Sequence, residues 1–273
     1  MMIVVADGSS LDAWASELSW GQRAILERKQ RSPRTYRYRS LRELEFELTM
    51  RLNTVYAAEG MAQGRAGFAT FADSRCNERF WILTPEGGFR IRPDTTPSAG
   101  INDIYNNSGL YAFECAAAVV IVLYKAVLDT IGAPRFDYWF RNLYIYSWNY
   151  DRDLHLIQHT GGEAFPGDVR YVDNPDFDPS AGQYRGENLI VLMQEDTYFG
   201  HGFGIVSEAS TIAALNRRRK PGATRSAYMT PEITHPDYAA IFAAIRTGPA
   251  FRRDHFLPFG EVAVRIGTLT HIR

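Results

Sequence analysis

The feature that most constrains the fold is one segment, residues 111–129, whose pattern is helical and apolar on every side. Its polar side chains are few: Glu114 lies near its start beside Cys115, and Lys125 and Asp129 lie near its end. A helix that is apolar all round must be covered by other elements, so it belongs in the middle of a core. The rest of the chain therefore has to supply the layers that cover it.

Two further helices are expected before this segment. An imperfect apolar stripe predicts one over residues 11–31. Ser40 is expected to cap the second, because Glu43 three residues later completes a capping box and leucines then follow at helical spacing. For the apolar helix itself, Ser108 or a neighbouring asparagine is the expected cap.

The remaining pattern is that of short strands separated by proline, glycine and aspartate, which indicates an antiparallel sheet. Strand-like pieces are expected at 68–71, 80–83, 136–140, 143–148, 169–172, 188–192 and 198–206, and short surface helices at 207–216 and 236–246. We therefore predict an α+β fold with a buried central helix packed on an antiparallel sheet, plus a helical N-terminal layer.

The length allows one or two domains, and the absence of a linker and of a repeat favours one. The chain has 273 residues, against a usual domain size of about 150, and it shows neither a low-complexity linker nor an internal repeat. Within this single domain we expect a helical layer over 1–60, a core over 61–250 and a tail segment over 251–273. The net charge of −1 gives no overall basic field, so nucleic acid is not the expected partner.

Location is inferred from two absences. The N-terminus has no basic region of the kind that opens a signal peptide, and the longest apolar run, 116–124, has nine residues against the roughly 20 needed to cross a bilayer. We expect a soluble, intracellular protein whose thiols stay reduced. Its two cysteines, Cys76 and Cys115, are then buried thiols or chemical groups rather than a framework of disulfides.

Cys115 has two interpretations. A cysteine in the opening turns of a helix lies at the positive end of the helix dipole, beside backbone N–H groups that favour a thiolate and that can hold a developing oxyanion. The alternative is that Cys115 is a small buried hydrophobic residue. The segment alone leaves both open.

A nucleophilic thiol needs a base, and later strands offer two candidates. Glu187 stands at the entry to the apolar strand 188–192. His201 lies in a segment where Gly200 and Gly202 flank it, and glycines at alternate strand positions indicate that another group packs closely there. Each also has an ordinary structural interpretation, as a strand-end carboxylate and as a core histidine.

Three other patterns are weighed and set aside. Residues 176–187 match four EF-hand ligand positions, but Ala181 replaces the required glycine. His155 and His159 have the spacing of a metal pair without the glutamate between them. The basic runs 28–39 and 217–220 could contact phosphates but are expected to be solvated or partner-facing surface. No metal site and no cofactor are expected.

Several short motifs carry a resemblance, in order, from about residue 40 to residue 240. They are Phe68-Ala-Thr-Phe71, Cys76-Asn77, Phe80-Trp81, Gly87-Gly-Phe89, Leu110-Tyr-Ala-Phe-Glu-Cys-Ala116, Pro166-Gly-Asp-Val-Arg-Tyr171, Asn174-Pro175, Gly186-Glu-Asn188, Tyr198-Phe-Gly-His-Gly202 and Gly222-Ala-Thr-Arg-Ser-Ala-Tyr228. Together they resemble the spore-coat protein-glutamine γ-glutamyltransferases of Bacillus-type sporulating bacteria. The ends of the chain do not contribute to this resemblance.

The resemblance implies a papain-like core, in which a cysteine at a helix N-terminus faces a small sheet. It also implies a calcium-independent transglutaminase, an acyltransferase that needs no cofactor and that joins glutamine and lysine side chains of coat proteins. The implied partners are such protein substrates, with neither nucleic acid nor membrane, and a monomer is favoured. The implied locations are the mother-cell cytoplasm and the spore coat.

Site residues also follow from the resemblance. It makes Cys115 the nucleophile and Glu187 the general base, with Glu114 as a possible substitute base and His201 close by in the active-site channel.

The channel aromatics of the family correspond to Phe68, Trp148 and Tyr184. At position 184 the family pattern has tryptophan where this chain has tyrosine. A glutamate base needs a raised pKa to work near neutral pH, which a dry channel with aromatic walls would provide.

Two other functions remain in competition at this point. One is a papain-like cysteine amidase or peptidase that uses Cys115 and His201. The other is a non-catalytic coat or scaffold protein in which Cys115 only packs the core.

Overall fold

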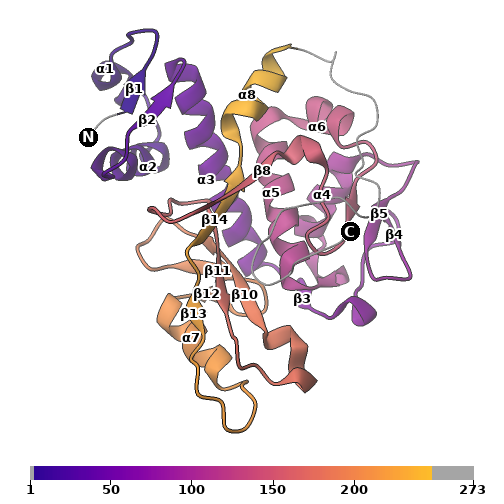
Figure 1. Cartoon of the computed structure of the whole chain (residues 1–273). Helices are drawn as coiled ribbons and strands as arrows, with labels where there is room; N and C mark the ends of the chain where they lie inside the picture. Colours follow the sequence, from indigo (N-terminus) through magenta and orange to yellow (C-terminus); the bar gives the residue numbers. More distant parts are fainter. Residues whose placement is uncertain (1–2, 248–273) are drawn as a thin grey trace.

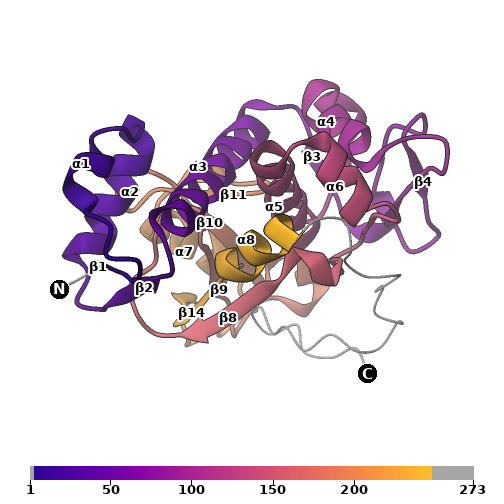
Figure 2. The same ribbon diagram turned by 90° about the horizontal axis from the view of Figure 1, so that it is seen from above.

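A buried helix lies at the centre of the molecule. The structure is a computed structural model that describes residues 3–247, so the expected tail, 251–273, lies outside the described residues. Helix α5 (Cys115–Ile131) packs against α3 (Leu41–Gln63), α4 (Pro97–Asn106) and α6 (Ala133–Trp139), as Figures 1 and 2 show. The expectation of a helix surrounded by other elements is confirmed.

The start of α5 corrects one expectation. The helix begins at Cys115, four residues after the expected start, because β6 (Ala112–Phe113) is extended and pairs in parallel with β3 (Gly67–Phe68). The cap is Glu114 rather than Ser108 or an asparagine: its carboxylate accepts a hydrogen bond from the Ala116 N–H at 3.0 Å. Pairing with β3 thus places Cys115 at the first position of the helix.

The main sheet has seven strands and packs against the N-terminal part of α5. Its order is β12-β11-β10-β9-β14-β8, with β13 also paired to β9, and every pairing is antiparallel. The strands are β8 (Leu156–Thr160), β9 (Val169–Asp173), β10 (Gly186–Val191), β11 (Tyr198–Gly200), β12 (Gly204–Val206), β13 (Tyr228–Met229) and β14 (Glu232–Pro236). The predicted α+β class with an antiparallel sheet is confirmed.

The N-terminal layer is helical, as predicted, but it is divided differently. Two helices, α1 (Leu11–Ala15) and α2 (Trp20–Arg31), replace the single expected one, because Ser19 and Gln22 form a capping box that starts α2. Strands β1 (Ile3–Val5) and β2 (Tyr36–Tyr38) pair in parallel beside them.

The predicted cap of α3 is confirmed in part. The Ser40 hydroxyl accepts from the Glu43 N–H. The Glu43 carboxylate, however, accepts from the Arg39 N–H at 2.6 Å, one residue before the cap.

Three strand predictions are wrong. Of the expected strand 68–71 only Phe68 lies in a strand, β3, and Phe71 starts a short 3-10 helix. Residues 136–139 belong to α6, where Phe136 and the C-cap residue Phe140, four residues apart, pack on the ring of Tyr124. The expected strand 198–206 is two strands, β11 and β12, joined by a turn at 201–203 in which Gly202 has φ +90°.

The remaining elements complete the core around α5. A three-stranded sheet contains β4 (Trp81–Leu83), β5 (Phe89–Ile91) and β7 (Tyr144–Ile145). The predicted short helices are present as α7 (Glu208–Asn216) and α8 (Tyr238–Thr247). Between residues 3 and 247, no helix is long and apolar enough to span a membrane.

Candidate active site

The Cys115 thiol lies at the N-terminus of α5 and is hydrogen-bonded to the residue before it. The S–H group donates to Glu114 Oε2 at 3.2 Å, and the same oxygen accepts the Ala116 N–H. A first-turn position gives the sulfur the positive end of the helix dipole. The helix start therefore holds a thiol and a carboxylate side by side.

Strand β10 supplies the opposite wall of the site. The Asn188 amide nitrogen lies 3.5 Å from the Cys115 sulfur. The neighbouring Glu187 side chain is 2% exposed, and its Oε1 has no hydrogen-bond partner within the described part of the chain. One thiol therefore has a hydrogen bond to the Glu114 carboxyl and an electrostatic interaction with the Glu187 carboxyl.

A glycine on the adjacent strand makes room for Glu187. Leu189 of β10 pairs with Gly200 of β11, and a Cβ atom at position 200 would lie 3.2 Å from Glu187 Oε1. It would lie 2.9 Å from Leu189 Cδ2 as well. The close packing that the sequence predicted beside the glycines of this segment is confirmed at Gly200, and the group that packs there includes the Glu187 carboxyl.

The electrostatics set the protonation of the three groups. Burial raises the pKa of the Cys115 thiol well above its usual range, and Glu187 and Glu114 raise it further. Burial and the nearby Glu114 also raise the pKa of Glu187 well above its usual value. Burial raises the pKa of Glu114 as well, but the Ala116 N–H and the Cys115 thiol oppose this. These shifts favour the uncharged forms of the thiol and of Glu187, and its two hydrogen bonds make Glu114 the more readily ionised of the two carboxyl groups.

His201 is buried and held by the backbone. Its Nε2 lies 3.1 Å from the Gly67 carbonyl oxygen, and its ring stacks on Phe113 with centroids 4.7 Å apart. Burial lowers the pKa of the imidazole, and the carbonyl groups of Gly67 and Phe113 oppose this. Among the described residues, the hydrogen bonds of the Cys115 sulfur are those with Glu114 and Asn188. This geometry does not support a papain-like Cys115–His201 pair.

The three aromatic residues expected to line the channel lie in different surroundings. Phe68 on β3 is 41% exposed, and its ring lies 6.3 Å from that of His201. Trp148 packs partly buried against the central core. Tyr184 packs in a separate apolar cluster beside the main sheet, with the Arg218 guanidinium over its ring. Their role as channel residues stays a prediction.

Sequence reasoning missed part of this site. Asn188 was recognised only as a member of the motif Gly186-Glu-Asn188, although its adjacency to a candidate base was a usable signal. A tightly packed aromatic wall beside Glu114, with no room for a water molecule, is missed too; it includes Phe71 and Tyr146, whose rings lie 4.7 Å apart. These two aromatics come from segments far apart in the sequence, so no local pattern pairs them.

The patterns set aside have structural roles. Asp176 of the calcium-like loop pairs with the Arg225 guanidinium at 2.6 Å and accepts the Arg225 N–H. His159 faces the Gly161 carbonyl with its Nδ1. Among residues 3–247, no cluster of three or more histidine, cysteine, aspartate or glutamate side chains is placed to hold a metal ion.

Known proteins are similar to this chain in sequence, and one solved structure is similar to it in fold as well. The family model for protein-glutamine gamma-glutamyltransferase matches residues 2–245. The protein-glutamine gamma-glutamyltransferase of Bacillus pumilus is 43% identical, over 81% of this chain and 89% of its own; that of Bacillus subtilis is 42% identical, over 79% and 87%. A solved transglutaminase from Geobacillus stearothermophilus, lacking its C-terminal extension, is 49% identical with a TM-score of 0.70, and covers 73% of this chain and 95% of its own.

Proposed function

The chain belongs to the protein-glutamine γ-glutamyltransferase family, and from this premise we propose that it cross-links proteins through an acyl intermediate on Cys115. The products are ε-(γ-glutamyl)lysine isopeptide bonds between glutamine and lysine side chains. The observation that carries the proposal is the Cys115 thiol at a helix N-terminus, hydrogen-bonded to the half-buried Glu114 and close enough to the buried Glu187 to interact with its charge. The reaction moves the acyl group twice, first to the thiol and then to the amine, and each step needs two proton transfers that the two carboxyl groups can perform.

The first transfer consumes the glutamine. The sulfur attacks the carboxamide carbon while the S–H proton passes to the Glu114 carboxylate, which already accepts its hydrogen bond. The C–N bond then breaks, and the neutral Glu187 carboxyl gives its proton to the leaving nitrogen, so that ammonia departs. A thioester remains on Cys115, with Glu114 now protonated and Glu187 ionised.

The second transfer consumes the lysine. Its uncharged amine attacks the thioester carbon and gives a proton to the Glu187 carboxylate, which acts as the general base in this step. The C–S bond breaks, and the proton held by Glu114 returns to the sulfur. Both carboxyl groups end in their starting states, so the cycle balances without a metal or a cofactor.

The negative oxygen of each tetrahedral intermediate needs a donor. The first-turn N–H of Ala116 is already bound by Glu114, which differs from the expectation that the helix start holds the oxyanion. The Asn188 amide nitrogen lies 3.5 Å from the sulfur, and the oxyanion forms on the carbon bonded to that sulfur, so this amide is close enough to donate to it. We assign Asn188 this donor role.

Water competes with the amine for the thioester, so the channel must be dry. The buried Glu187 and the aromatic side chains Phe71 and Tyr146 beside Glu114 favour such a channel. Phe68, Trp148 and Tyr184 remain the proposed further channel residues. The proposed substrates are proteins of a spore coat, and the proposed places of action are the mother-cell cytoplasm and the coat itself.

The proposal is tested by amine incorporation. The protein is incubated in excess chelator with a lysine-blocked, glutamine-rich protein and a fluorescent primary amine. Wild-type protein should label the substrate; Cys115→Ala should abolish labelling; Cys76→Ala is the matched control and should retain it. Labelling that requires calcium, or that survives Cys115→Ala, would contradict the proposal.

A further inference from the structure

A second cavity lies away from the thiol, between the N-terminal layer and one end of the main sheet. It has a volume of about 230 Å³ and is lined from α2, β2, α3, β8, β14 and the start of α8. Asp168 on its wall directly precedes β9, whose Val172 pairs with Glu187. Four strand residues place it on the order of 13 Å from the proposed active site.

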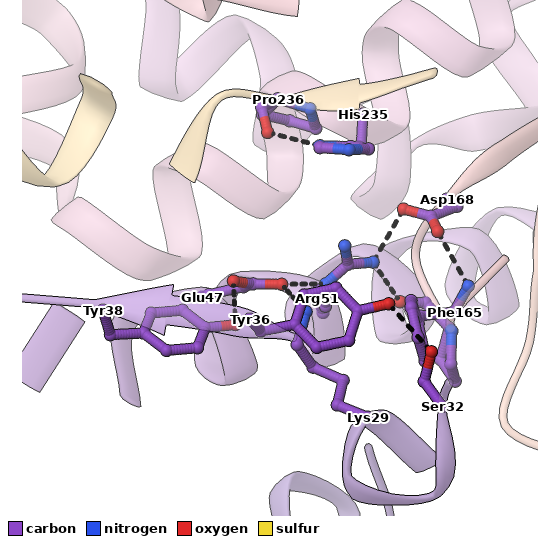
Figure 3. Close-up of polar contacts among 11 residues, drawn as sticks. Lys29, Ser32, Tyr36, Tyr38, Glu47, Arg51, Phe165, Asp168, His235 and Pro236 are labelled. Atoms are coloured by element: carbon purple, nitrogen blue, oxygen red, sulfur yellow. Dashed lines mark hydrogen bonds and ion pairs between the residues drawn. The ribbon is translucent and has the colours of Figure 1, made fainter. Parts of the chain in front are cut away.

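The floor of this cavity is a chain of four buried charges of alternating sign, drawn in Figure 3. Lys29 Nζ donates to Glu47 Oε1 at 2.7 Å, Arg51 Nε donates to the same oxygen at 2.7 Å, and Arg51 Nη1 donates to Asp168 Oδ1 at 2.7 Å. The four charges sum to zero. Buried ion pairs rarely stabilise a fold more than apolar packing would, so stability alone does not account for them.

The acidic groups around the cavity are already occupied by donors of the protein. Glu47 also accepts from the Tyr38 hydroxyl, and Asp168 also accepts the Phe165 N–H. The Glu43 carboxylate accepts a hydrogen bond from the Arg39 N–H. The Asp237 carboxylate accepts one from the Ala240 N–H in the first turn of α8. Glu163, exposed at the rim, is the exception.

Several hydrogen-bond donors around the cavity, in contrast, have no acceptor or only one within the described residues. The Tyr238 side chain lines the cavity and is 5% exposed, and within the described residues its hydroxyl has no hydrogen-bond partner. Lys29 Nζ has one carboxylate partner and otherwise lies over the ring of Tyr36, 4.0 Å from its centroid. At the mouth, the exposed guanidinium groups of Arg34 and Arg37 complete this surplus.

The walls between floor and mouth are aromatic. Phe165 lies under the Lys29 ammonium at 4.9 Å, and His235 stacks on Tyr238 with centroids 5.4 Å apart. His235 Nδ1 lies 2.8 Å from the Pro236 carbonyl and donates to it, and burial lowers the pKa of the ring, so His235 adds no charge. A flat apolar body fits between such walls.

From this surplus of donors and these walls, we propose that the cavity is a binding site for a small organic carboxylate with a planar apolar body. The carboxylate accepts from the Tyr238 hydroxyl and from the cations around it, and the body lies against the rings. The volume is below the roughly 300–1,000 Å³ of drug-sized sites, which limits the ligand to a small molecule. The site is independent of the thiol chemistry.

Benzoate is the probe, added to the full chain and followed by isothermal titration calorimetry. We expect binding at millimolar concentration or below, with no binding of benzyl alcohol, which has the ring without the charge. Tyr238→Phe removes only the unpartnered hydroxyl and should weaken benzoate about 5- to 10-fold, the effect of one hydrogen bond. Tyr105→Phe is the matched control, because it removes another unpartnered buried hydroxyl outside the cavity and should leave binding unchanged.

The mouth is tested separately. Arg34→Gln/Arg37→Gln should weaken benzoate, whereas Arg31→Gln/Arg39→Gln, two exposed arginines outside the cavity, should not. Alkylation of Cys115 should leave binding intact. The proposal is overturned by absence of benzoate binding up to about 10 mM, by binding that Tyr238→Phe and the mouth variant leave unchanged, or by binding lost on alkylation. Inorganic phosphate binding in place of benzoate would also overturn it, since it would indicate a site for bare oxyanions.

Discussion

Asn188 adds a hydrogen-bond donor to a site that otherwise consists of a thiol and two carboxyl groups. Its amide contacts the Cys115 sulfur, while its own Oδ1 is buried without a partner within the described residues. Asn188→Ala should lower kcat for amine incorporation by about 100-fold or more, the usual effect of losing an oxyanion donor. It should also slow alkylation of Cys115, because the amide favours the thiolate.

The matched control is Asn53→Ala, which removes an amide that bonds Thr130 between two helices. It should leave both rates near those of wild type. An Asn188→Ala variant as active as wild type would remove Asn188 from the mechanism.

The two carboxyl groups predict a bell-shaped pH profile of kcat. Burial raises the pKa of Glu114 above the ordinary 4.5, so its carboxylate is lost, and activity falls, at a higher pH than an exposed glutamate would give. The alkaline limb comes from Glu187, whose raised pKa keeps the needed proton until pH rises through it. The measurement is kcat from acid to alkaline pH, with circular dichroism to confirm folding. A rate that stays flat down to the pH of an ordinary glutamate would contradict this assignment.

At the scale of single residues, the sequence was informative where a side chain sits in a local pattern. Cys115 at a helix start follows from the apolar segment behind it, and the close packing beside Gly200 follows from the alternating glycines. The contacts of Asn188 and Phe71 depend on how distant segments meet, which no local pattern encodes. The roles of Glu187, Glu114 and His201 came from the family resemblance and stay predictions.

Among the elements, strand β11 leaves room for the Glu187 carboxyl because Gly200 has no side chain. Gly200→Ala should push a methyl group against Glu187 Oε1 and Leu189 Cδ2 and lower kcat at least about 10-fold, at a stability cost of about 1–3 kcal/mol. Gly182→Ala is the control, because a Cβ there meets nothing within 4 Å. Amine incorporation and thermal unfolding of both variants check this. Full activity of Gly200→Ala would show that Glu187 does not need its present position.

Helices and strands are predicted correctly where the sequence follows either the helical or the strand periodicity alone, and incorrectly where both patterns fit the same residues. The buried helix, Ser40 as the N-cap of α3, and the strands 169–172 and 188–192 are correct predictions, although Glu43 does not complete the expected capping box. The aromatic content of residues 136–140 predicts a strand, yet residues 136–139 lie in α6, because Phe136 and the C-cap residue Phe140 pack together on Tyr124. Tertiary packing outweighs the strand preference of aromatic residues.

On the scale of the whole molecule, buried charges join the N-terminal layer to the core. Glu47 on α3 bonds Lys29 on α2, and Arg51 links it to Asp168 beside the main sheet. Glu47→Ala leaves two buried cations without this partner and should cost about 3–5 kcal/mol of unfolding free energy. Glu45→Ala, an exposed glutamate of the same helix, should change it by no more than about 0.5 kcal/mol.

The same network predicts sensitivity to acid. Burial alone would raise the pKa of Glu47, but Lys29 and Arg51 outweigh it and hold that pKa below the ordinary 4.5. The stabilisation is therefore present above pH 4.5 and is lost as pH falls through the depressed value. Urea unfolding across this range measures both effects. A Glu47→Ala variant with wild-type stability, or with an unchanged acid limb, would refute the role of the network.

The central claim is that Cys115 carries the acyl group. Wild-type protein is mixed with a glutamine-bearing peptide in the absence of amine, quenched in acid, digested, and examined by mass spectrometry. The account predicts a thioester on the Cys115 fragment, with the mass of the peptide less one ammonia, which disappears when a primary amine is added before quenching. An adduct on Cys76, or amine incorporation that proceeds without any adduct on Cys115, would contradict it.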